Sequence, residues 1–152
     1  MAIAVADTSF LFSLFGNDAH TKAAHNWTRQ SQLPIAVSAL NRYEFGNAIR
    51  FAAFRKASLQ ADALASLAAF ETDMKTGHLH LATCDLAAVL AEAARLSELH
   101  TLSGGHRSFD ILHVAAAKIL KATIFLSFDS NQRTLAATAR LNIGPWFKSR
   151  TP

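Results

Sequence analysis

Short apolar runs alternate with longer amphipathic stretches along the chain, and this alternation constrains the fold more than any other feature of the sequence. Such runs suit buried parallel strands, and the stretches between them suit the helices that cover a parallel sheet. We therefore expect an α/β domain with a mostly parallel central sheet of about four or five strands. Strands are expected at 3–6, 35–37, 79–82, 123–128 and 141–143, helices near 9–15, 20–32, 39–55, 58–77, 85–102, 109–121 and 131–140, and an irregular tail from 144 on.

Residues with known preferences at helix ends set the expected boundaries. Thr8 or Ser9 is expected to cap the first helix, and Ser108 the helix from 109, because hydroxyl oxygens accept hydrogen bonds from the free N–H groups of a first turn. Gly77 suits the left-handed residue that commonly follows a helix.

The composition is that of one compact globular domain, 1–152. Hydrophobic residues make up 51% and charged residues 17%, which is unlike a disordered chain. The single cysteine, Cys84, has no partner for an internal disulfide. The apolar start has no positive n-region and is interrupted by Asp7, and no uncharged run approaches the ~18 residues of a membrane span. We expect a soluble cytoplasmic protein without a membrane segment.

The charge balance is basic, since 15 Lys and Arg against 11 Asp and Glu give a formal net charge of +4. If some of the acids hold metal ions, the rest of the surface is more basic still. A basic body around a small acidic pocket suits a polyanionic substrate and a cationic cofactor. Charge alone leaves this open, because many basic proteins bind no nucleic acid.

Four carboxylates occupy positions that such a fold brings towards one edge of the sheet. Asp7 and Asp129 directly follow the first and fourth expected strands, and ligands bind at the carboxyl ends of parallel strands. Asp110 lies in the first turn of a helix, two residues after its expected cap. Glu44 lies in the second turn of the helix after Ser38, on a largely apolar face where an acid needs a partner.

Acids that converge in this way repel one another, and they stay ionised together only if cations neutralise them. Oxygen ligands without Cys or clustered His favour Mg²⁺ or Mn²⁺ over Zn²⁺. Two such ions can activate a water and stabilise the leaving oxygen of a phosphodiester. The residues alone therefore indicate metal-dependent phosphodiester chemistry.

Each acid also has an ordinary structural explanation. Asp7 can cap the first helix, Asp110 can complement the dipole of its helix, and Asp129 can form an Asx-turn. The partners open to Glu44 are Arg42 and Arg107. These explanations are independent of one another, whereas one shared site accounts for all four positions.

Four motifs follow one another along nearly the whole chain. A strand leads into Asp7-Thr8-Ser9, and a Ser-x-x-x-x-x-Glu helix runs from Ser38 to Glu44. Arg107-Ser108-Phe109-Asp110 then opens an apolar helix, and Phe125-Leu126-Ser127-Phe128-Asp129 ends a strand. In this order the motifs resemble those of the PIN-domain family, and within it the VapC-type toxins of bacterial toxin–antitoxin pairs. The segment 56–102 matches nothing specific.

The resemblance implies a Rossmann-like three-layer α/β/α fold, with Mg²⁺ or Mn²⁺ held by Asp7, Glu44, Asp110 and Asp129. It implies endonucleolytic cleavage of RNA, often a structured RNA such as tRNA or rRNA. It also implies inhibition by a small antitoxin protein whose tail covers the site, and homodimers are usual in the family. Asn131 stands where some relatives carry a further acid, so hydrogen bonding rather than charge is expected of it.

Several neighbours of the acids are candidate supporting residues. Thr8 and Ser127 suit a hydrogen bond to a ligand carboxylate or a metal-bound water, and Arg107 suits a contact with phosphate; capping, strand-end bonding and a plain surface position are equally open. His113, one helical turn from Asp110 in an apolar helix, is expected to be a core histidine rather than a general base.

Two further groups of side chains are open to more than one interpretation. Basic residues on and after the Glu44 helix suit an RNA track or a solvated helix face; they are Arg42, Arg50, Arg55 and Lys56. Three phenylalanines crowd the first helix, and we expect one of them to face a dimer or antitoxin surface; they are Phe10, Phe12 and Phe15.

Other functions on a similar fold compete with this interpretation. A non-catalytic binding or regulatory module would keep the basic surface without turnover, but the presence of all four acids favours a nuclease. A haloacid-dehalogenase-like phosphatase needs a second Asp two residues after Asp7, where this chain has Ser9, and a receiver domain needs paired acids near the start. A PIN-fold DNA nuclease stays open, because telling RNA from DNA needs contacts to the 2′-OH.

Overall fold

The five apolar runs form one sheet in the computed structural model, which describes residues 2–146. The strands are β1 (Ala4–Ala6), β2 (Ile35–Ser38), β3 (Leu79–Ala82), β4 (Ile124–Leu126) and β5 (Ile143–Gly144), in the spatial order β3-β2-β1-β4-β5. Every pair of neighbouring strands is parallel. The expected α/β domain with a parallel sheet of about four or five strands is confirmed.

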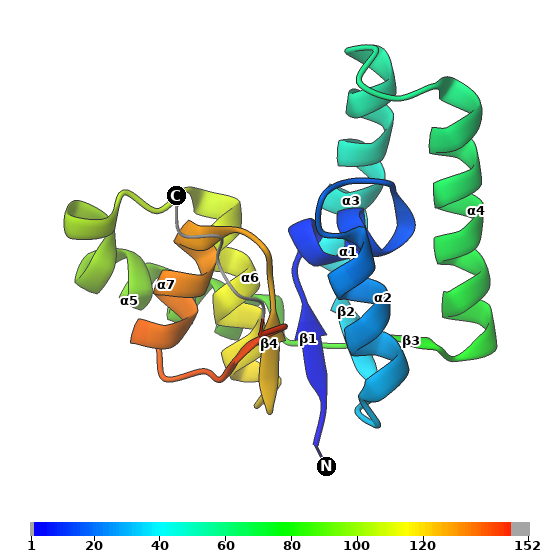
Figure 1. Cartoon of the computed structure of the whole chain (residues 1–152). Coiled ribbons are helices and arrows are strands. Elements are labelled where there is room, and N and C mark those ends of the chain that lie inside the picture. Colours follow the sequence, from blue (N-terminus) through cyan, green and yellow to red (C-terminus); the bar gives the residue numbers. More distant parts are fainter. Residues whose placement is uncertain (1, 147–152) are drawn as a thin grey trace.

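Successive residues of each strand point to opposite faces of the sheet, and each face carries its own apolar core. On β1, Ala4 and Ala6 belong to one core and Val5 to the other. Helices α1–α4 cover the first face and α5–α7 the second, so the domain has three layers (Figure 1). The helices are α1 (Thr8–Phe15), α2 (Thr21–Gln30), α3 (Ala39–Phe54), α4 (Gln60–Thr76), α5 (Leu86–Gly104), α6 (Ser108–Ile119) and α7 (Ser130–Thr138).

The strand order creates a switch point between β1 and β4. From β1 the chain moves outwards through β2 to β3, and it then returns to place β4 on the other side of β1. Ala6 pairs with Leu126, so the two strands end side by side and their connections leave in opposite directions. Open parallel sheets bind ligands at such points, and Asp7 and Asp129 stand in these two connections.

The observed helix starts differ from the expected ones in an informative way. Asp7, and not Thr8 or Ser9, caps α1, because its carboxylate accepts from the backbone N–H of Phe10. Ser108 is the first residue of α6 and not its cap; Arg107 stands at the cap position without a side-chain capping bond.

The ends of other elements mostly follow the sequence pattern. Gly77 has φ 80° after α4, as expected for a helix-ending glycine. Helix α4 begins at Gln60, two residues later than expected. Gly144 belongs to β5, so the expectation of an irregular tail is wrong at that residue, and 147–152 lie outside the described residues.

The phenylalanines of α1 do not present an exposed ring. Phe10 is fully buried, and Phe12 and Phe15 pack against the same core, because α2 and α4 close over α1. As expected, the three rings are not all fully buried, because Phe12 and Phe15 are only partly buried. That one of them faces a dimer or antitoxin surface stays a prediction. Exposed aromatic rings lie on α3, at Tyr43, Phe51 and Phe54.

None of the helices within residues 2–146 combines the length and apolar character needed to cross a bilayer.

Candidate functional site

A pocket of about 410 Å³ lies at the switch point, at the carboxyl ends of β1 and β4. Glu44 from α3, Asp110 from α6 and Asp129 from the start of α7 line it together. Asp7 does not line the pocket, because its side chain is fully buried beneath the pocket-lining residues Thr8 and Ser9. The structure thus brings three of the four acids to one cavity and places the fourth behind its wall.

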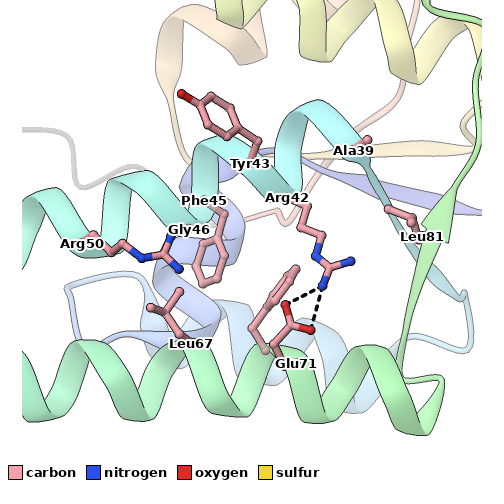
Figure 2. A pocket seen from close by; sticks show the side chains of 10 residues that line it. Ala39, Arg42, Tyr43, Phe45, Gly46, Arg50, Leu67, Glu71 and Leu81 are labelled. Carbon is pink, nitrogen blue, oxygen red and sulfur yellow. Dashed lines mark hydrogen bonds and ion pairs between the residues drawn. The ribbon is translucent and has the colours of Figure 1, made fainter.

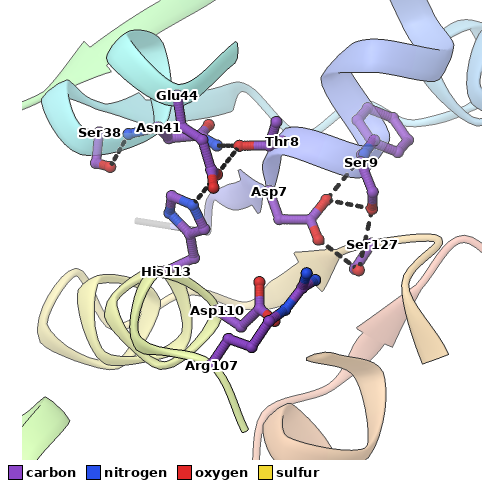
Figure 3. Close-up of polar contacts among 11 residues, drawn as sticks. Asp7, Thr8, Ser9, Ser38, Asn41, Glu44, Arg107, Asp110, His113 and Ser127 are labelled. Atoms are coloured by element: carbon purple, nitrogen blue, oxygen red, sulfur yellow. Dashed lines mark hydrogen bonds and ion pairs between the residues drawn. The ribbon is translucent and has the colours of Figure 1, made fainter. Parts of the chain in front are cut away.

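Asp7 is held by hydrogen bonds to both of its carboxylate oxygens. Oδ1 accepts from Ser9 Oγ at 2.7 Å and from the Phe10 N–H at 2.8 Å, and Oδ2 accepts from Ser127 Oγ at 2.5 Å (Figure 3). Complete burial raises the pKa of Asp7 from 3.8 to about 6, against the opposing effect of these bonds. A carboxylate in this setting is rigid, and a cation beside it would favour its ionised form.

Glu44 is fixed by two donors that come from different layers of the fold. Its Oε2 accepts from Thr8 Oγ1 and lies 2.5 Å from His113 Nε2 (Figure 3). Burial favours a higher pKa for Glu44, but the hydrogen bonds from His113 and Thr8 hold this pKa below its ordinary value. Glu44 therefore faces the pocket as an anion of fixed orientation.

His113 is buried, as expected of a core histidine, but its ring belongs to this network. Within residues 2–146 its Nδ1 has no hydrogen-bond partner. The ring is therefore held in the network through Nε2, which bonds Glu44. His113 thus positions Glu44.

Of the four acids, Asp110 and Asp129 are the other two that line the pocket. Asp110 Oδ2 accepts from Arg107 Nε at 3.1 Å, and Asp129 Oδ1 caps α7 by accepting from the Gln132 N–H at 2.8 Å. Burial raises the pKa of Asp110; Arg107 opposes this rise, and the charges of Asp129 and Glu44 add to it. The acids therefore repel one another through the pocket, as the sequence argument supposed.

Carboxylate oxygens that accept no hydrogen bond show whether this site suits a cation. Within the described residues, one oxygen on each of three acids accepts no hydrogen bond; these are Glu44 Oε1, Asp110 Oδ1 and Asp129 Oδ2. Carboxylate oxygens without donors in a shared pocket fit Mg²⁺ or Mn²⁺ by their chemistry. As they stand, however, no three Asp, Glu, His or Cys side chains among residues 2–146 already surround a metal position.

The supporting residues divide into those that join the site and one that does not. Thr8 and Ser127 donate to Glu44 and Asp7, and Arg107 lines the pocket. Asn131 points elsewhere, since its Nδ2 lies 3.5 Å from the Gly105 carbonyl and its side chain is absent from the pocket lining.

A second pocket, of about 390 Å³, lies between α3 and α4 and contains none of the four acids (Figure 2). There Arg42 forms a bidentate ion pair with Glu71 at 2.8 Å. Arg42 is therefore not the partner of Glu44, and its charge is already neutralised within the protein.

Several residues of the site were not predicted from the sequence. Asn41 is buried and packs on Thr8; with its amide oxygen towards α1 it accepts from the Thr8 N–H and donates to the Ala6 carbonyl, each at 2.9 Å. Ser9 bonds Asp7, and the nearly buried Gln132 lines the pocket with an unpartnered Oε1 among the described residues. Their helical spacing from Asp7, Glu44 and Asp129 was the available signal, since each lies within three residues of one of these acids.

Comparisons with known proteins agree with this architecture. The family model described as "PIN domain" matches residues 4–138. A comparison with curated protein sequences finds no match.

Solved structures with the same fold include several bacterial proteins. Mycobacterium tuberculosis VapC20, described as a sarcin–ricin loop cleaving toxin, superposes with a TM-score of 0.67 at 14% identity, over 86% of this chain and 93% of that one. VapBC-1 from nontypeable Haemophilus influenzae gives 0.65 at 14% identity, over 96% and 99% of the two chains. FitAcB from Neisseria gonorrhoeae gives 0.61 at 13% identity, over 93% and 96%. At these identities the likeness shows a shared fold.

Proposed function

Because the chain belongs to the PIN-domain family, we propose that it is an endoribonuclease that hydrolyses RNA phosphodiesters with Mg²⁺ or Mn²⁺ held by Glu44, Asp110 and Asp129, with Asp7 as the fourth acid of the site behind them. The observation that carries this proposal is the pocket at the switch point, where three acids each keep one oxygen without a donor. Asp7 supports them from behind, on the connection after β1.

The residues of the chain have distinct parts in this chemistry. When bound, divalent ions would lower the pKa of a water and neutralise the charge on the leaving oxygen. Ser9 and Ser127 hold Asp7, and Thr8 and His113 hold Glu44, so that the anionic groups need little reorganisation when substrate arrives. In the reaction the water oxygen forms a bond to phosphorus and the P–O bond to the departing ribose breaks. The water gives a proton to solvent or a neighbouring carboxylate, and the departing ribose oxygen takes a proton from solvent to become a hydroxyl.

The biological role we propose is that of the toxin in a toxin–antitoxin pair. One structural relative is described as a sarcin–ricin loop cleaving toxin, and others are VapBC and FitAcB complexes. By this analogy the partners are an RNA substrate, a small antitoxin protein and a second copy of this chain, in the cytoplasm. The exposed rings of Tyr43, Phe51 and Phe54 on α3 are consistent with a surface that a protein partner covers.

The test is cleavage of a labelled mixture of tRNA, rRNA fragments and single-stranded DNA in Mg²⁺, Mn²⁺ or EDTA, with Asp7→Asn as control. We expect RNA to be cut in either metal and left intact in EDTA or with the variant. Cutting of the DNA instead would identify a PIN-fold DNA nuclease.

A second candidate, a non-catalytic RNA-binding or regulatory module, is favoured by two observations. Arg107 already pairs with Asp110, and no three candidate ligands within residues 2–146 surround an ion position. RNA binding that survives without any cleavage in Mg²⁺ and Mn²⁺ would establish that role.

A further inference from the structure

The carboxylate pocket already contains a positive charge supplied by the chain itself. Arg107 lines the pocket, and its Nε lies 3.1 Å from Asp110 Oδ2. Its charge also interacts with Asp129 and Glu44, so it faces three of the four acids. Among the Lys and Arg side chains of residues 2–146, Arg107 is the one that lines this pocket, which His20 also lines.

The two members of this ion pair have very different surroundings. The side chain of Arg107 is 78% exposed, whereas that of Asp110 is 9% exposed. Exposed arginines gain little from ion pairs and keep much of their rotamer freedom. Asp110 is nearly buried and close to other anions, so it depends on a counter-charge far more than Arg107 depends on Asp110. The acids therefore depend on this ion pair more than the arginine does, and the solvent-exposed member of the pair is the arginine.

Arg107 is also placed so that it can leave without disturbing the fold. It stands at the cap position of α6 and forms no capping bond with its side chain. Asp110, by contrast, is fixed in the first turn of α6. Rotation of the Arg107 side chain into solvent would free Asp110 Oδ2 while the helix stays in place.

We infer that the Arg107 guanidinium is a resident cation, which neutralises the acid pocket while no divalent ion is bound and is displaced from Asp110 when one binds. This inference rests on the proposed metal-dependent function. It predicts that Arg107 and the metal compete for the Asp110 carboxylate. Metal binding should therefore weaken the Arg107–Asp110 ion pair, and this ion pair should lower the apparent affinity of the site for metal.

The first experiment measures Mn²⁺ binding by isothermal titration calorimetry to the wild type, Arg107→Ala and Arg107→Lys. Removing the guanidinium frees an Asp110 oxygen and makes the pocket more negative, so we expect Arg107→Ala to bind Mn²⁺ about 5- to 20-fold more tightly, a coupling of ordinary size. Lysine keeps the charge but lacks the planar fork, so Arg107→Lys should fall between the two.

Arg95→Ala is the matched control. Arg95 pairs with Glu92 at the same i,i+3 spacing on α5, and Glu92 also holds Lys118 at 3.0 Å. Lys118 is eleven residues beyond Arg107 in sequence, which places this pair about 16 Å from the pocket along α6. Arg95→Ala removes the same charge and should change the Mn²⁺ affinity less than twofold.

A second measurement observes the displacement directly. In ¹⁵N spectra of the folded wild type, the Nε–H resonance of Arg107, assigned by its loss in Arg107→Lys, should shift on titration with diamagnetic Mg²⁺ and approach the position of a solvent-exposed arginine. The Nε–H resonance of Arg95 should stay in place.

The outcomes separate this inference from the proposed function. Mn²⁺ binding to the wild type that is unchanged or weaker in Arg107→Ala would overturn the resident cation and leave the metal site standing. Mn²⁺ binding to neither protein would overturn both proposals. Binding to Arg107→Ala but not to the wild type would support the resident cation in its strongest form.

Discussion

At the scale of single residues, the site depends on carboxylates that are buried and yet ready to carry charge. Asp7 shows how this is achieved, because three donors surround it, from Ser9, Phe10 and Ser127. These donors stabilise the anion, but they do not fully compensate for the loss of water, and the pKa of Asp7 rises to about 6. At neutral pH the ionised Asp7 therefore lowers the stability of the folded protein.

A pH dependence of stability follows from this pKa. The folded protein holds the Asp7 proton more tightly than the unfolded chain, whose ordinary value is 3.8. Stability in EDTA should therefore fall as the pH rises from about 4 to about 6, and then level off, with an Asp7 contribution of up to about 3 kcal/mol. Urea unfolding of the wild type and Asp7→Asn at pH 4.5 and 7.4 measures it.

The two proteins should differ least at pH 4.5, where Asp7 is protonated and neutral. At pH 7.4 and without metal, Asp7→Asn should be the more stable protein. Parallel stability curves for the two proteins across this range would show that the Asp7 side chain is not desolvated in the way described.

A second prediction at this scale concerns His113, which forms a hydrogen bond with Glu44. Burial raises the pKa of Glu44, and the His113 bond is the main effect that opposes this rise. In His113→Leu the pKa of Glu44 should rise, so the acidic limb of the pH–rate profile should move to higher pH. We expect kcat to fall about tenfold with little change in KM, a size typical for loss of one positioning hydrogen bond.

His113→Gln is the conservative comparison, because its amide can still donate to Glu44. It should recover part of kcat and move the acidic limb back towards the wild type. If His113→Leu and His113→Gln give the same profile, the histidine only fills space in the core.

At the scale of elements, the site is built from helix starts. Asp7 caps α1, Asp129 caps α7, and Asp110 lies in the first turn of α6. Each of these acids is thus placed where backbone N–H groups are unsatisfied and the helix dipole favours negative charge. The ordinary explanations of Asp7 and Asp110 are therefore correct descriptions of their local structure, and they coexist with a shared pocket.

Substitutions of Asp129 can separate its role as a helix cap from its proposed role as a metal ligand. Asparagine is as good a helix cap as aspartate, whereas alanine costs about 1 kcal/mol. Asp129→Asn should therefore change the free energy of unfolding by no more than a few tenths of a kcal/mol, but it should lose RNA cleavage. Asp129→Ala should lose RNA cleavage and also lower the free energy of unfolding by about 1 kcal/mol. Urea unfolding and RNA cleavage of the same preparations test this pair.

The control is Asp85, which caps α5 through the Ala87 N–H at 3.0 Å and lies outside the pocket. Asp85→Asn should change neither stability nor cleavage. Full activity in Asp129→Asn would remove Asp129 from the metal ligands that we propose.

The elements also show how far the sequence predicts this molecule. Strand ends are visible in the sequence, so the placement of Asp7 and Asp129 at one edge of the sheet followed from topology alone. The contact of Glu44 with His113 joins residues 69 positions apart and depends on how α3 packs against α6, which periodicity does not encode. The degree to which each ring of α1 is buried could not be predicted for the same reason, since it depends on how α2 and α4 pack against that helix.

At the scale of the whole molecule, the pocket stands between the two cores. Glu44 comes from α3, which packs on one face of the sheet, and Asp110 comes from α6, which packs on the other. An ion held by both would join the two helical layers across the switch point. Metal should therefore stabilise the entire fold rather than one loop.

The size of this effect can be estimated from mass action. A ligand at 100 times its Kd adds about 2.7 kcal/mol to the stability of the folded state. For a chain of 152 residues, this corresponds to a rise in Tm of about 5–10 °C. We expect such a rise in Mg²⁺ or Mn²⁺ relative to EDTA, in a single calorimetric transition.

Hydrogen exchange locates the stabilisation. Because the ligands come from both layers, amides of α3 and of α6 should both gain protection on metal binding, and Asp110→Asn should lose most of the gain in both helices. Protection confined to α6 would mean that Glu44 takes no part in binding, and the ion would then be a ligand of one layer and not a link between two.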